Sequence, residues 1–528
     1  MPGRAVRQNA PDVSVMSGFD IRAFISAAAS ASAGGTVPAA RFRRRAVPTA
    51  EAVAPIVIRR SYSPAIVSGV ARFVEFALVM LAGLFVHQVY LSSTVPLDGA
   101  YLLATAGAAA LTTLVFQAIG VYSVQAFRSF FIYALRLVAG WSLVFLFLLA
   151  AVFFAKVGED FSRVWLAGWF VFGLALLLVE RIVLGLLVSA LTRNGRFDRR
   201  TAIVGGGELA ESMIRALNVQ TDTGIQLVGI FDDRAEDRSP DIVSGYPKLG
   251  SVDDLVEYAR RTSLDLIVFT LPISAETRLL QILAKLWVLP IDIRLSAHSS
   301  KLRLRPRAYS YIGTVPLLDL FDKPIADWDL VLKWIFDKVV GALMLLVLSP
   351  LMLAVAIAVK LDSRGPILFR QKRFGFNNEL IEVFKFRSMY IDQADENAAK
   401  LVTRGDPRVT RVGRFIRKTS LDELPQLFNV VFKGNLSLVG PRPHALHAKA
   451  EDRLYDQVVD GYFARHKVKP GITGWAQVNG WRGETNTSEK IQRRVEHDLY
   501  YIENWSVFFD LYILALTPFA LLKSENAY

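Results

Sequence analysis

The 528-residue sequence contains no cysteine, few histidines and fewer acidic than basic residues. Without cysteine, disulfides, zinc sites built on cysteine and thiol nucleophiles are excluded. The 6 histidines are scattered along the chain. Asp and Glu number 48 against 61 Lys and Arg, which leaves a formal net charge of +13. A catalytic nucleophile is therefore not a thiol, and the ligands are expected to be anionic.

Hydrophobic residues make up 52% of the sequence, which is high for a soluble enzyme. The basic residues flank apolar runs along the chain. That arrangement suits anionic lipid headgroups and phosphorylated substrates better than nucleic acid, so no nucleic-acid partner is expected. At this length we expect several domains, with a membrane α-helical part and an α/β part.

The first two segments are predicted to be a tail and a membrane region. Residues 1–65 are rich in Ala, Ser, Pro and Arg, which predicts a disordered basic tail. Segment 66–192 holds four apolar runs of transmembrane length, at 66–91, 99–119, 131–155 and 163–190. Arginines precede the first run, separate the second from the third and follow the fourth, so the tail and the remaining chain are predicted to be cytoplasmic. Glu180 and Arg181, within the fourth run, are expected to lie near a helix end or to snorkel.

Residues 199–300 alternate between strand-like and helix-like segments, which predicts a doubly wound parallel sheet of Rossmann-like type. Gly205, Gly207 and Ala210 fit the pattern G-x-G-x-x-A at a strand-to-helix turn. Asp232 ends the next strand, where a ribose partner would lie. These residues are candidates for nucleotide binding, but the same glycines also serve a tight turn and close helix packing. Both interpretations remain open.

A predicted linker, 301–330, carries the basic stretch KLRLRPR and leads to a fifth apolar run, Val339 to Val359. Basic residues flank this run on both sides, which argues against crossing the membrane. Ser349 and Pro350 lie at its midpoint, where proline removes a helix hydrogen bond. We predict a re-entrant helix–break–helix over 331–361; a kinked spanning helix is the alternative.

An adjacent acid pair, Asp422 and Glu423, lies among basic residues in KTSLDELPQLFNVVFKGNLSLVGPRPH. One interpretation is a helix start, with Ser420 as N-cap and Glu423 as its capping-box partner. The other is phosphate chemistry, because a carboxylate ringed by Arg and Lys can hold Mg²⁺ against a diphosphate or attack phosphorus itself. The two interpretations are compatible, since a cap would place the acids.

From Lys333 onward the chain resembles the bacterial sugar transferases that act as polyprenyl-phosphate hexose-1-phosphate transferases, the monotopic phosphoglycosyl transferases. The matching blocks recur in order: FDKVVGALMLLVLSPLMLAVAIAVKLDSRGPILFRQKRFG, FKFRSM, RVTRVGRFIRKTSLDELPQLFNVVFKGNLSLVGPRPH, VKPGITGWAQVNGWRG and DLYYIENWSVFFDLYIL. The front half resembles the long subgroup, such as undecaprenyl-phosphate glucose phosphotransferase, in its layout of four helices and a Rossmann-like domain. The resemblance implies a small α/β catalytic domain at 362–528.

The resemblance also implies a reaction: transfer of a sugar 1-phosphate from a UDP-sugar to undecaprenyl phosphate, with Mg²⁺ and release of UMP. Asp422 matches the family's covalent nucleophile, and Glu423 matches the residue that assists it; from its charge, Asp422 is also the expected ligand of Mg²⁺. The charge of a diphosphate has to be neutralised during attack, and Lys385, Arg387, Arg417 and Arg442 are the expected cations. Three further candidates for substrate binding have surface charge as their alternative interpretation: Arg373, Arg482 and Asp498.

These features predict a multi-pass protein of the bacterial inner membrane whose catalytic domain faces the cytoplasm. A homodimer is possible. The expected product initiates exopolysaccharide, capsule or O-antigen assembly, with glucose or galactose as the expected sugar. The alternative function is a membrane-anchored nucleotide or lipid sensor with an idle transferase module.

Overall fold

The computed structural model describes residues 61–523 except 94, 129, 221–222, 235–238, 273–274, 298–308, 313–314, 392–405, 445–448, 451–452, 455–458, 460 and 482–486. The chain forms two compact units, of which one is Arg59–Arg199 and the other contains Arg200–Tyr528. The predicted disordered tail, 1–65, lies outside the described residues up to residue 60.

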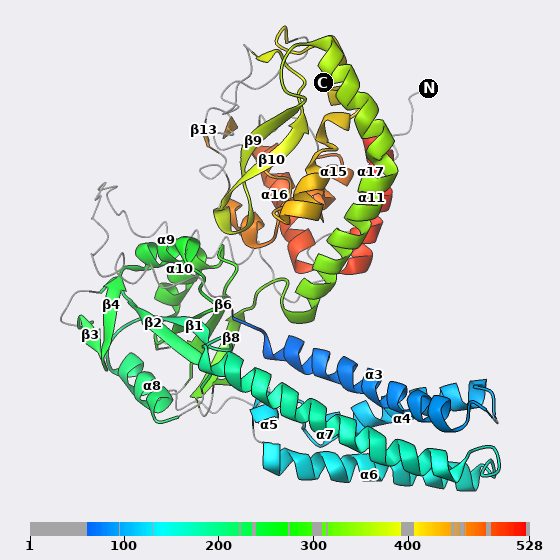
Figure 1. The fold of residues 1–528 in the computed structure, drawn as a ribbon. Coiled ribbons are helices and arrows are strands. Elements are labelled where there is room, and N and C mark those ends of the chain that lie inside the picture. The colour runs from blue at the N-terminus through cyan, green and yellow to red at the C-terminus, as the bar shows by residue number, and fades with distance from the viewer. Residues whose placement is uncertain are drawn as a thin grey trace, which may run out of the picture. The chain divides into compact units, whose positions relative to one another are not determined.

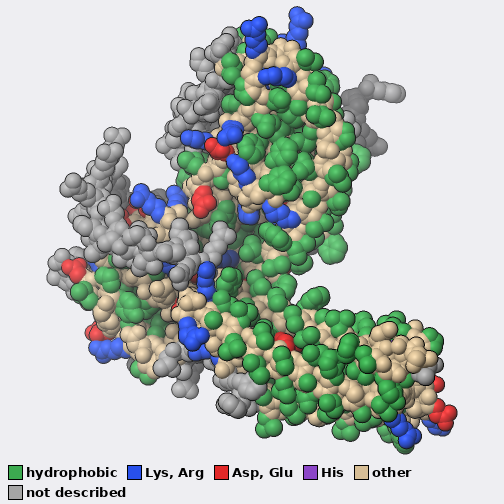
Figure 2. Space-filling model, viewed as in Figure 1, with side chains coloured by type: hydrophobic (Ala, Val, Ile, Leu, Met, Phe, Trp, Pro, Cys, Tyr) green, Lys and Arg blue, Asp and Glu red, His purple; other side chains and the backbone are tan. Residues whose placement is uncertain are grey.

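The first unit is helical (Figure 1). Its helices are α3 (Pro64–Tyr90), α4 (Gly99–Ala118), α5 (Val124–Arg128), α6 (Phe130–Phe154) and α7 (Arg163–Arg193). The four longer helices coincide with the four predicted apolar runs and are long and apolar enough to cross a membrane. Ser63, Asp98 and Ser162 cap three of them by accepting first-turn amide hydrogen bonds. Figure 2 shows hydrophobic side chains over the visible surface of this unit, as expected for a lipid-facing one.

Buried charges in the helical unit are paired with one another. Glu75 on α3 is fully buried and accepts hydrogen bonds from Arg181 on α7 and from the hydroxyl of Tyr122. Arg181 also donates to the carbonyl of Val121 at 3.0 Å. The expectation that Arg181 snorkels is therefore wrong, because a carboxylate on a neighbouring helix satisfies it in the interior.

The second unit begins with an eight-stranded sheet in the order β3-β4-β2-β1-β5-β6-β8-β7. Its elements are β1 (Arg199–Val204), α8 (Glu208–Asn218), β2 (Ile225–Phe231), β3 (Ile242–Val243), β4 (Tyr246–Gly250), α9 (Val252–Arg261), β5 (Leu266–Phe269), α10 (Glu276–Leu286), β6 (Asp292–Ser296), β7 (Tyr309–Ile312) and β8 (Val315–Phe321). The pairs β1–β5, β5–β6 and β2–β4 are parallel. The predicted doubly wound parallel sheet is therefore correct for these strands, while β3, β7 and β8 add antiparallel edges.

Both faces of this sheet are covered by helices (Figure 1). Leu266 and Val268 of β5 pack in a cluster with Met213 of α8. Ile267 and Phe269 of the same strand pack in the cluster that holds residues of α9 and α10. The alternation follows from the strand period of two, which sends neighbouring side chains to opposite faces.

The predicted linker 301–330 is wrong in part, because it contains two strands. Within it, β8 pairs antiparallel with β6 and with β7. The sequence signal was short: Tyr309, Tyr311 and Ile312 precede Gly313 and Val315 follows Thr314, so aromatic and β-branched residues lie on both sides of a glycine. The sheet thus extends to Phe321, and the next helix already begins at Asp327.

The C-terminal domain combines one long helix with short strands and helices (Figure 1). Its elements are α11 (Asp327–Asp362), β9 (Leu368–Phe374), η5 (Phe376–Asn378), β10 (Leu380–Phe386), α12 (Arg411–Lys418), η7 (Leu421–Glu423), α13 (Gln426–Phe428), η8 (Asn429–Lys433), β11 (Ser437–Val439), β12 (Lys449–Ala450), β13 (Arg453–Leu454), η9 (Tyr462–Lys467), β14 (Gly471–Thr473), α15 (Trp475–Val478), α16 (Ser488–Glu503) and α17 (Val507–Lys523). β9 and β10 form an antiparallel hairpin. This is the predicted small α/β domain.

Helix α11 is continuous through Pro350, although a break was predicted at Ser349-Pro350. Proline has no N–H to donate to the carbonyl four residues earlier, that of Leu346. The hydroxyl of Ser349 donates to this carbonyl at 2.8 Å and replaces the missing hydrogen bond. The helix therefore continues with a bow, which Figure 1 shows, where an interruption was expected.

Both ends of α11 are fastened to the C-terminal domain. Near the N-terminal end, Lys333 bonds the Asp510 carboxylate at 2.6 Å and the Val439 carbonyl at 3.0 Å. At the other end, Arg387 donates to the carbonyls of Ser363 and Arg364 at 2.7 and 2.9 Å. The apolar helix and the rest of the domain are therefore one packed body.

The sheet and the C-terminal domain share a hydrophobic core. Trp287, which follows α10, is buried in the same cluster as Tyr462 and Leu427, and Phe321 of β8 packs against that cluster. A Cβ atom on Gly461, at the start of η9, would lie 2.2 Å from the Trp287 ring. Gly461 also has φ +73°, so both the close approach and the backbone require glycine there.

Candidate active site

The acid pair Asp422-Glu423 lies in η7, a single 3₁₀ turn that follows α12. Ser420 precedes it in the left-handed region, with φ 60°, and its side chain makes no capping hydrogen bond to the turn. The interpretation of Ser420 as N-cap is therefore wrong: its backbone has left the extended conformation that an N-cap adopts. The turn places two carboxylates side by side without using either as a cap.

Glu423 is held by two cations from different elements. Lys385 of β10 lies 3.0 Å from its Oε1. Arg442, in the loop after β11, donates to Oε1 at 2.5 Å and to Oε2 at 3.3 Å. The Glu423 side chain is 12% exposed. Burial alone would raise its pKa, but Arg442 and Lys385 outweigh burial and hold the pKa of Glu423 well below its usual range.

Asp422 is in a different electrostatic position. Burial raises the pKa of its carboxyl above the usual value, against the opposing charges of Lys385, Arg417 and Arg442, and the charge of Glu423 adds to the rise. Environments that push the pKa values of two adjacent acids apart assign them different roles. Glu423 is bonded by two cations, and Asp422 is the more basic of the two carboxylates.

A buried asparagine, which the sequence gave no reason to single out, fixes the strand that carries Lys385. Asn429 is fully buried at the start of η8. Its Oδ1 accepts from the amide of Phe384 at 2.9 Å, and its Nδ2 donates to the carbonyl of Glu382 at 2.6 Å. Because only Leu424, Pro425 and the short helix α13 separate η8 from the acid pair, this side chain ties Lys385 to the segment that holds Glu423.

The other predicted cations are distributed differently. Arg417, in the last turn of α12, contributes positive charge at Asp422. Arg387 is 5% exposed and bonds the carbonyls at the C-terminal end of α11, so the structure does not bring its guanidinium to the acid pair. Arg373 on β9 donates to Gln371 of the same strand at 2.6 Å. Arg482 lies outside the described residues.

Asp498 on α16 is buried and faces another arginine. It is 2% exposed, and its Oδ2 accepts from Arg465 of η9 at 2.6 Å. This placement is that of an internal ion pair. Arg465 did not stand out in the sequence, because only the fold brings η9 and α16 together.

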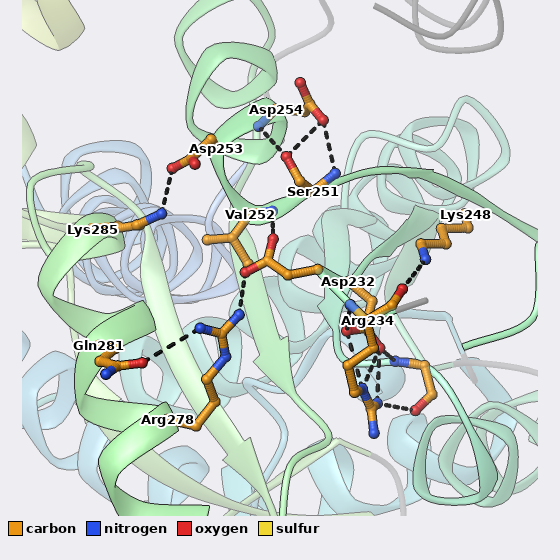
Figure 3. Close-up of polar contacts among 12 residues, drawn as sticks. Asp232, Arg234, Lys248, Ser251, Val252, Asp253, Asp254, Arg278, Gln281 and Lys285 are labelled. Carbon is orange, nitrogen blue, oxygen red and sulfur yellow. Dashed lines mark hydrogen bonds and ion pairs between the residues drawn. The ribbon is translucent and has the colours of Figure 1, made fainter. Parts of the chain in front are cut away.

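In the sheet domain, the predicted nucleotide-binding loop is bonded internally. Gly205 and Gly207 have φ +100° and +96°, which explains the glycines. The Asp232 carboxylate accepts from the Gly206 amide at 2.6 Å and from the Arg234 guanidinium, which itself donates to the Gly206 carbonyl at 2.5 Å (Figure 3). These contacts favour the structural interpretation of the glycines.

A second set of contacts in Figure 3 joins the helices of that domain. Asp233 accepts from the Val252 amide at 2.8 Å and from the Arg278 guanidinium, and Lys285 bonds Asp253 at 2.7 Å. The acids that follow β2 therefore tie β2 to α9 and α10.

Comparisons with known proteins match two family models to this chain. Residues 328–524 match the family described as bacterial sugar transferase, and residues 117–297 match the family described as CoA-binding domain. The acid pair and its cations lie within the first match. The second match runs from the end of α4 to the end of β6.

Several relatives are similar to this protein over much of the chain. An undecaprenyl-phosphate glucose phosphotransferase of Komagataeibacter xylinus is 42% identical over 68% of this chain and 66% of the relative. The UDP-glucose:undecaprenyl-phosphate glucose-1-phosphate transferase of Escherichia coli K12 is 37% identical over 74% and 82%. The enzyme of that name from Xanthomonas campestris is 34% identical over 87% of this chain and 94% of its own length. With the acid pair and its cations in place, these matches show that the chain belongs to the bacterial sugar transferase family.

Proposed function

We propose that this chain transfers a sugar 1-phosphate from a UDP-sugar to undecaprenyl phosphate and releases UMP. The observation that carries the proposal is the adjacent acid pair, in which Glu423 bonds Lys385 at 3.0 Å and Arg442 at 2.5 Å while Arg417 adds positive charge at Asp422. The names of the relatives support UDP-glucose as donor. Other relatives are named for galactose and N-acetylgalactosamine, so the donor experiment compares all three UDP-sugars.

The proposed mechanism has two displacements at one phosphorus. An Asp422 oxygen attacks the phosphorus that bears the sugar; the bond from that phosphorus to the bridging oxygen breaks, and UMP leaves with the bridging oxygen. An oxygen of undecaprenyl phosphate then attacks the same phosphorus and displaces Asp422, which gives undecaprenyl diphosphate-sugar. Two steps let a soluble and a lipid substrate use one site in turn.

The surrounding residues supply charge and orientation. Arg417 and Lys385 lie beside Asp422, where they offset the negative charge of an entering diphosphate. Glu423 holds Lys385 and Arg442 in fixed positions through its ion pairs, so the cations need not reorganise during the reaction. Its lowered pKa keeps it ionised in this role.

The site also fits a magnesium ion. Among the residues that the structure describes, no group of three or more His, Cys, Asp or Glu side chains could hold a metal. Mg²⁺ is commonly held by one or two carboxylates, with the remaining ligands from substrate phosphates and water. Asp422 fits that pattern, because the Glu423 oxygens are already bonded to cations. Bound there with the diphosphate, Mg²⁺ would neutralise phosphate charge.

We further propose that α11 enters one membrane leaflet and keeps both ends on the cytoplasmic side of the inner membrane. At 36 residues it is about 54 Å long, and Lys333 and Arg387 fasten its two ends to one domain. A crossing would carry one end past a hydrocarbon core of about 30 Å. The apolar side chains around Pro350 are exposed and available to lipid: Leu343, Leu346, Val347, Leu351 and Leu353.

The two-step reaction predicts UMP release in the absence of lipid acceptor. Purified protein with Mg²⁺ and UDP-glucose labelled in the sugar should release up to one equivalent of UMP and retain label on a peptide that contains Asp422. UDP-galactose and UDP-N-acetylgalactosamine serve as parallel donors. If UMP forms only after undecaprenyl phosphate is added and no labelled peptide is trapped, the lipid attacks directly and Asp422 is a ligand only.

The topology proposal predicts which positions react with an impermeant thiol reagent in intact cells. Because the chain has no cysteine, single substitutions report cleanly. Ser93→Cys, in the loop after α3, should be labelled from outside. Glu489→Cys on α16 and Glu257→Cys on α9 should be labelled only after permeabilisation. Labelling of Glu489→Cys but not Glu257→Cys in intact cells would mean that α11 crosses the membrane.

A further inference from the structure

A buried arginine outside the acid pair contacts the main chain of one of its cations. Arg465 of η9 is 1% exposed. Its Nη2 donates to the carbonyl of Arg442 at 2.7 Å and to the Asp498 carboxylate at 2.6 Å. One nitrogen thus joins α16 to the loop after β11. Arg442 is therefore held through its main chain by Arg465, while its own guanidinium holds Glu423.

The environment of Arg465 is arranged around its charge. A buried cation requires a partner, and Asp498, 2% exposed, supplies the negative charge. On the other side, Nη1 lies 2.6 Å from Nδ1 of His444. Burial and the charges of Arg465 and Arg494 hold the pKa of His444 well below its usual range, so the imidazole is neutral and able to accept this hydrogen bond.

The loop that carries Arg442 is constrained by close backbone contacts at its start. A Cβ atom on Gly440 would lie 2.6 Å from the carbonyl oxygen of Lys469, so β11 and the chain before β14 are in close contact there. Gly440 also donates to the Thr473 carbonyl at 2.9 Å. With the loop fixed before Arg442 by these contacts, Arg465 fixes the carbonyl of Arg442 itself.

We propose that Arg465, oriented by Asp498, is a positioning residue. Through its hydrogen bond to the Arg442 carbonyl, Arg465 holds Arg442 in the position from which the Arg442 guanidinium bonds Glu423. The inference rests on the proposed transferase function and deepens it. Asp498, predicted from the sequence as a substrate-binding residue, acts here through Arg465. A misplacement of about 1 Å caused by a distant mutation can cost about a hundredfold in rate, so we expect a measurable catalytic effect from this remote ion pair.

The test is a double-mutant cycle on UMP release by the full chain in detergent. Arg465→Lys keeps the charge but loses the forked geometry, and Asp498→Asn keeps the shape but loses the charge. Each should lower kcat/KM by about ten- to a hundredfold. In an Arg442→Lys background Arg465→Lys should have little additional effect, because its route to Glu423 is already altered. In a Lys385→Arg background its full effect should remain, since Lys385 reaches Glu423 from a different strand.

Active-site titration provides a second readout. The size of the UMP burst without lipid acceptor counts the folded, active protein, and kcat is then expressed per active site. Arg465→Lys and Asp498→Asn should keep the burst size and lower kcat per active site, as in Arg442→Lys. A residue that supports only the fold would lower the burst size and leave kcat per active site unchanged.

Three results would overturn the inference while wild-type UMP release stands: equal multiplicative effects of Arg465→Lys in both backgrounds, unchanged kcat/KM in the two single variants, or thermal unfolding of both variants at low temperature. In the last case Arg465 holds the fold and not the site. Failure of the wild-type protein to release UMP from any UDP-sugar would instead contradict the proposed function.

Discussion

Asp422→Asn should abolish nearly all transfer, with a rate loss on the order of a thousandfold or more. The amide keeps the size and the hydrogen bonding of the side chain, but it lacks the charge needed to attack phosphorus and to bind Mg²⁺. Without lipid acceptor, no burst of UMP and no labelled Asp422 peptide should appear. The measurement is single-turnover UMP release with labelled UDP-glucose.

Asp406→Asn is the matched control for this variant. Asp406 is also in the C-terminal domain, is buried, and bonds Arg408 at 2.6 Å. Its substitution removes a paired aspartate charge at a position that we do not assign to chemistry, and turnover should stay within several-fold of wild type. A burst of UMP from Asp422→Asn would contradict the role of Asp422 as nucleophile.

Glu423→Gln should lower kcat by about a hundredfold or more while moving the acid limb of the pH profile to lower pH. Lys385 and Arg442 lose the carboxylate that holds them, so the charges that face the diphosphate become misplaced. At the same time Asp422 loses a negative neighbour that raises its pKa. Lys385 and Arg442, released from Glu423, remain beside Asp422 and continue to lower its pKa. The pKa of Asp422 therefore falls, and ionised Asp422 persists to lower pH. The quantity to measure is kcat as a function of pH.

Glu382→Gln provides the comparison for this second variant. Glu382 lies on β10 with Lys433 at 3.5 Å, but its side chain is 45% exposed, and such surface pairs contribute little. Glu382→Gln should leave both kcat and the acid limb of the pH profile unchanged. A rise of the acid limb in Glu423→Gln would show that the coupling between the two acids has the opposite sign.

The sequence identified the chemical types in the site but not the direction of every side chain. Lys385 and Arg387 lie two positions apart, and an extended strand would point both to the same face. β10 ends at Phe386, so the alternation ends before Arg387, and that side chain bonds the end of α11. The end of a short strand is set by tertiary packing, which no local pattern records.

Contacts between distant segments account for the remaining differences. Arg465 and Asp498 are separated by thirty-three positions in sequence, and neither belongs to a motif that names a partner. The break expected at Pro350 is absent because of a local contact: the Ser349 hydroxyl donates to the helix carbonyl that proline leaves without a donor. The overall order of membrane helices, sheet domain and C-terminal domain was accessible because it depends on long apolar runs and on strand–helix alternation.

The contact between Gly461 and the Trp287 ring affects how domains of this family can be exchanged. η9, which carries Arg465, is preceded by Gly461, whose lack of a side chain leaves room for a ring from the sheet domain. A chimaera that joins this C-terminal domain to the front half of another family member would keep Gly461 but lose Trp287, whose ring packs against it. A functional boundary for such grafts therefore lies before α10, so that Trp287 and the segment it supports move together.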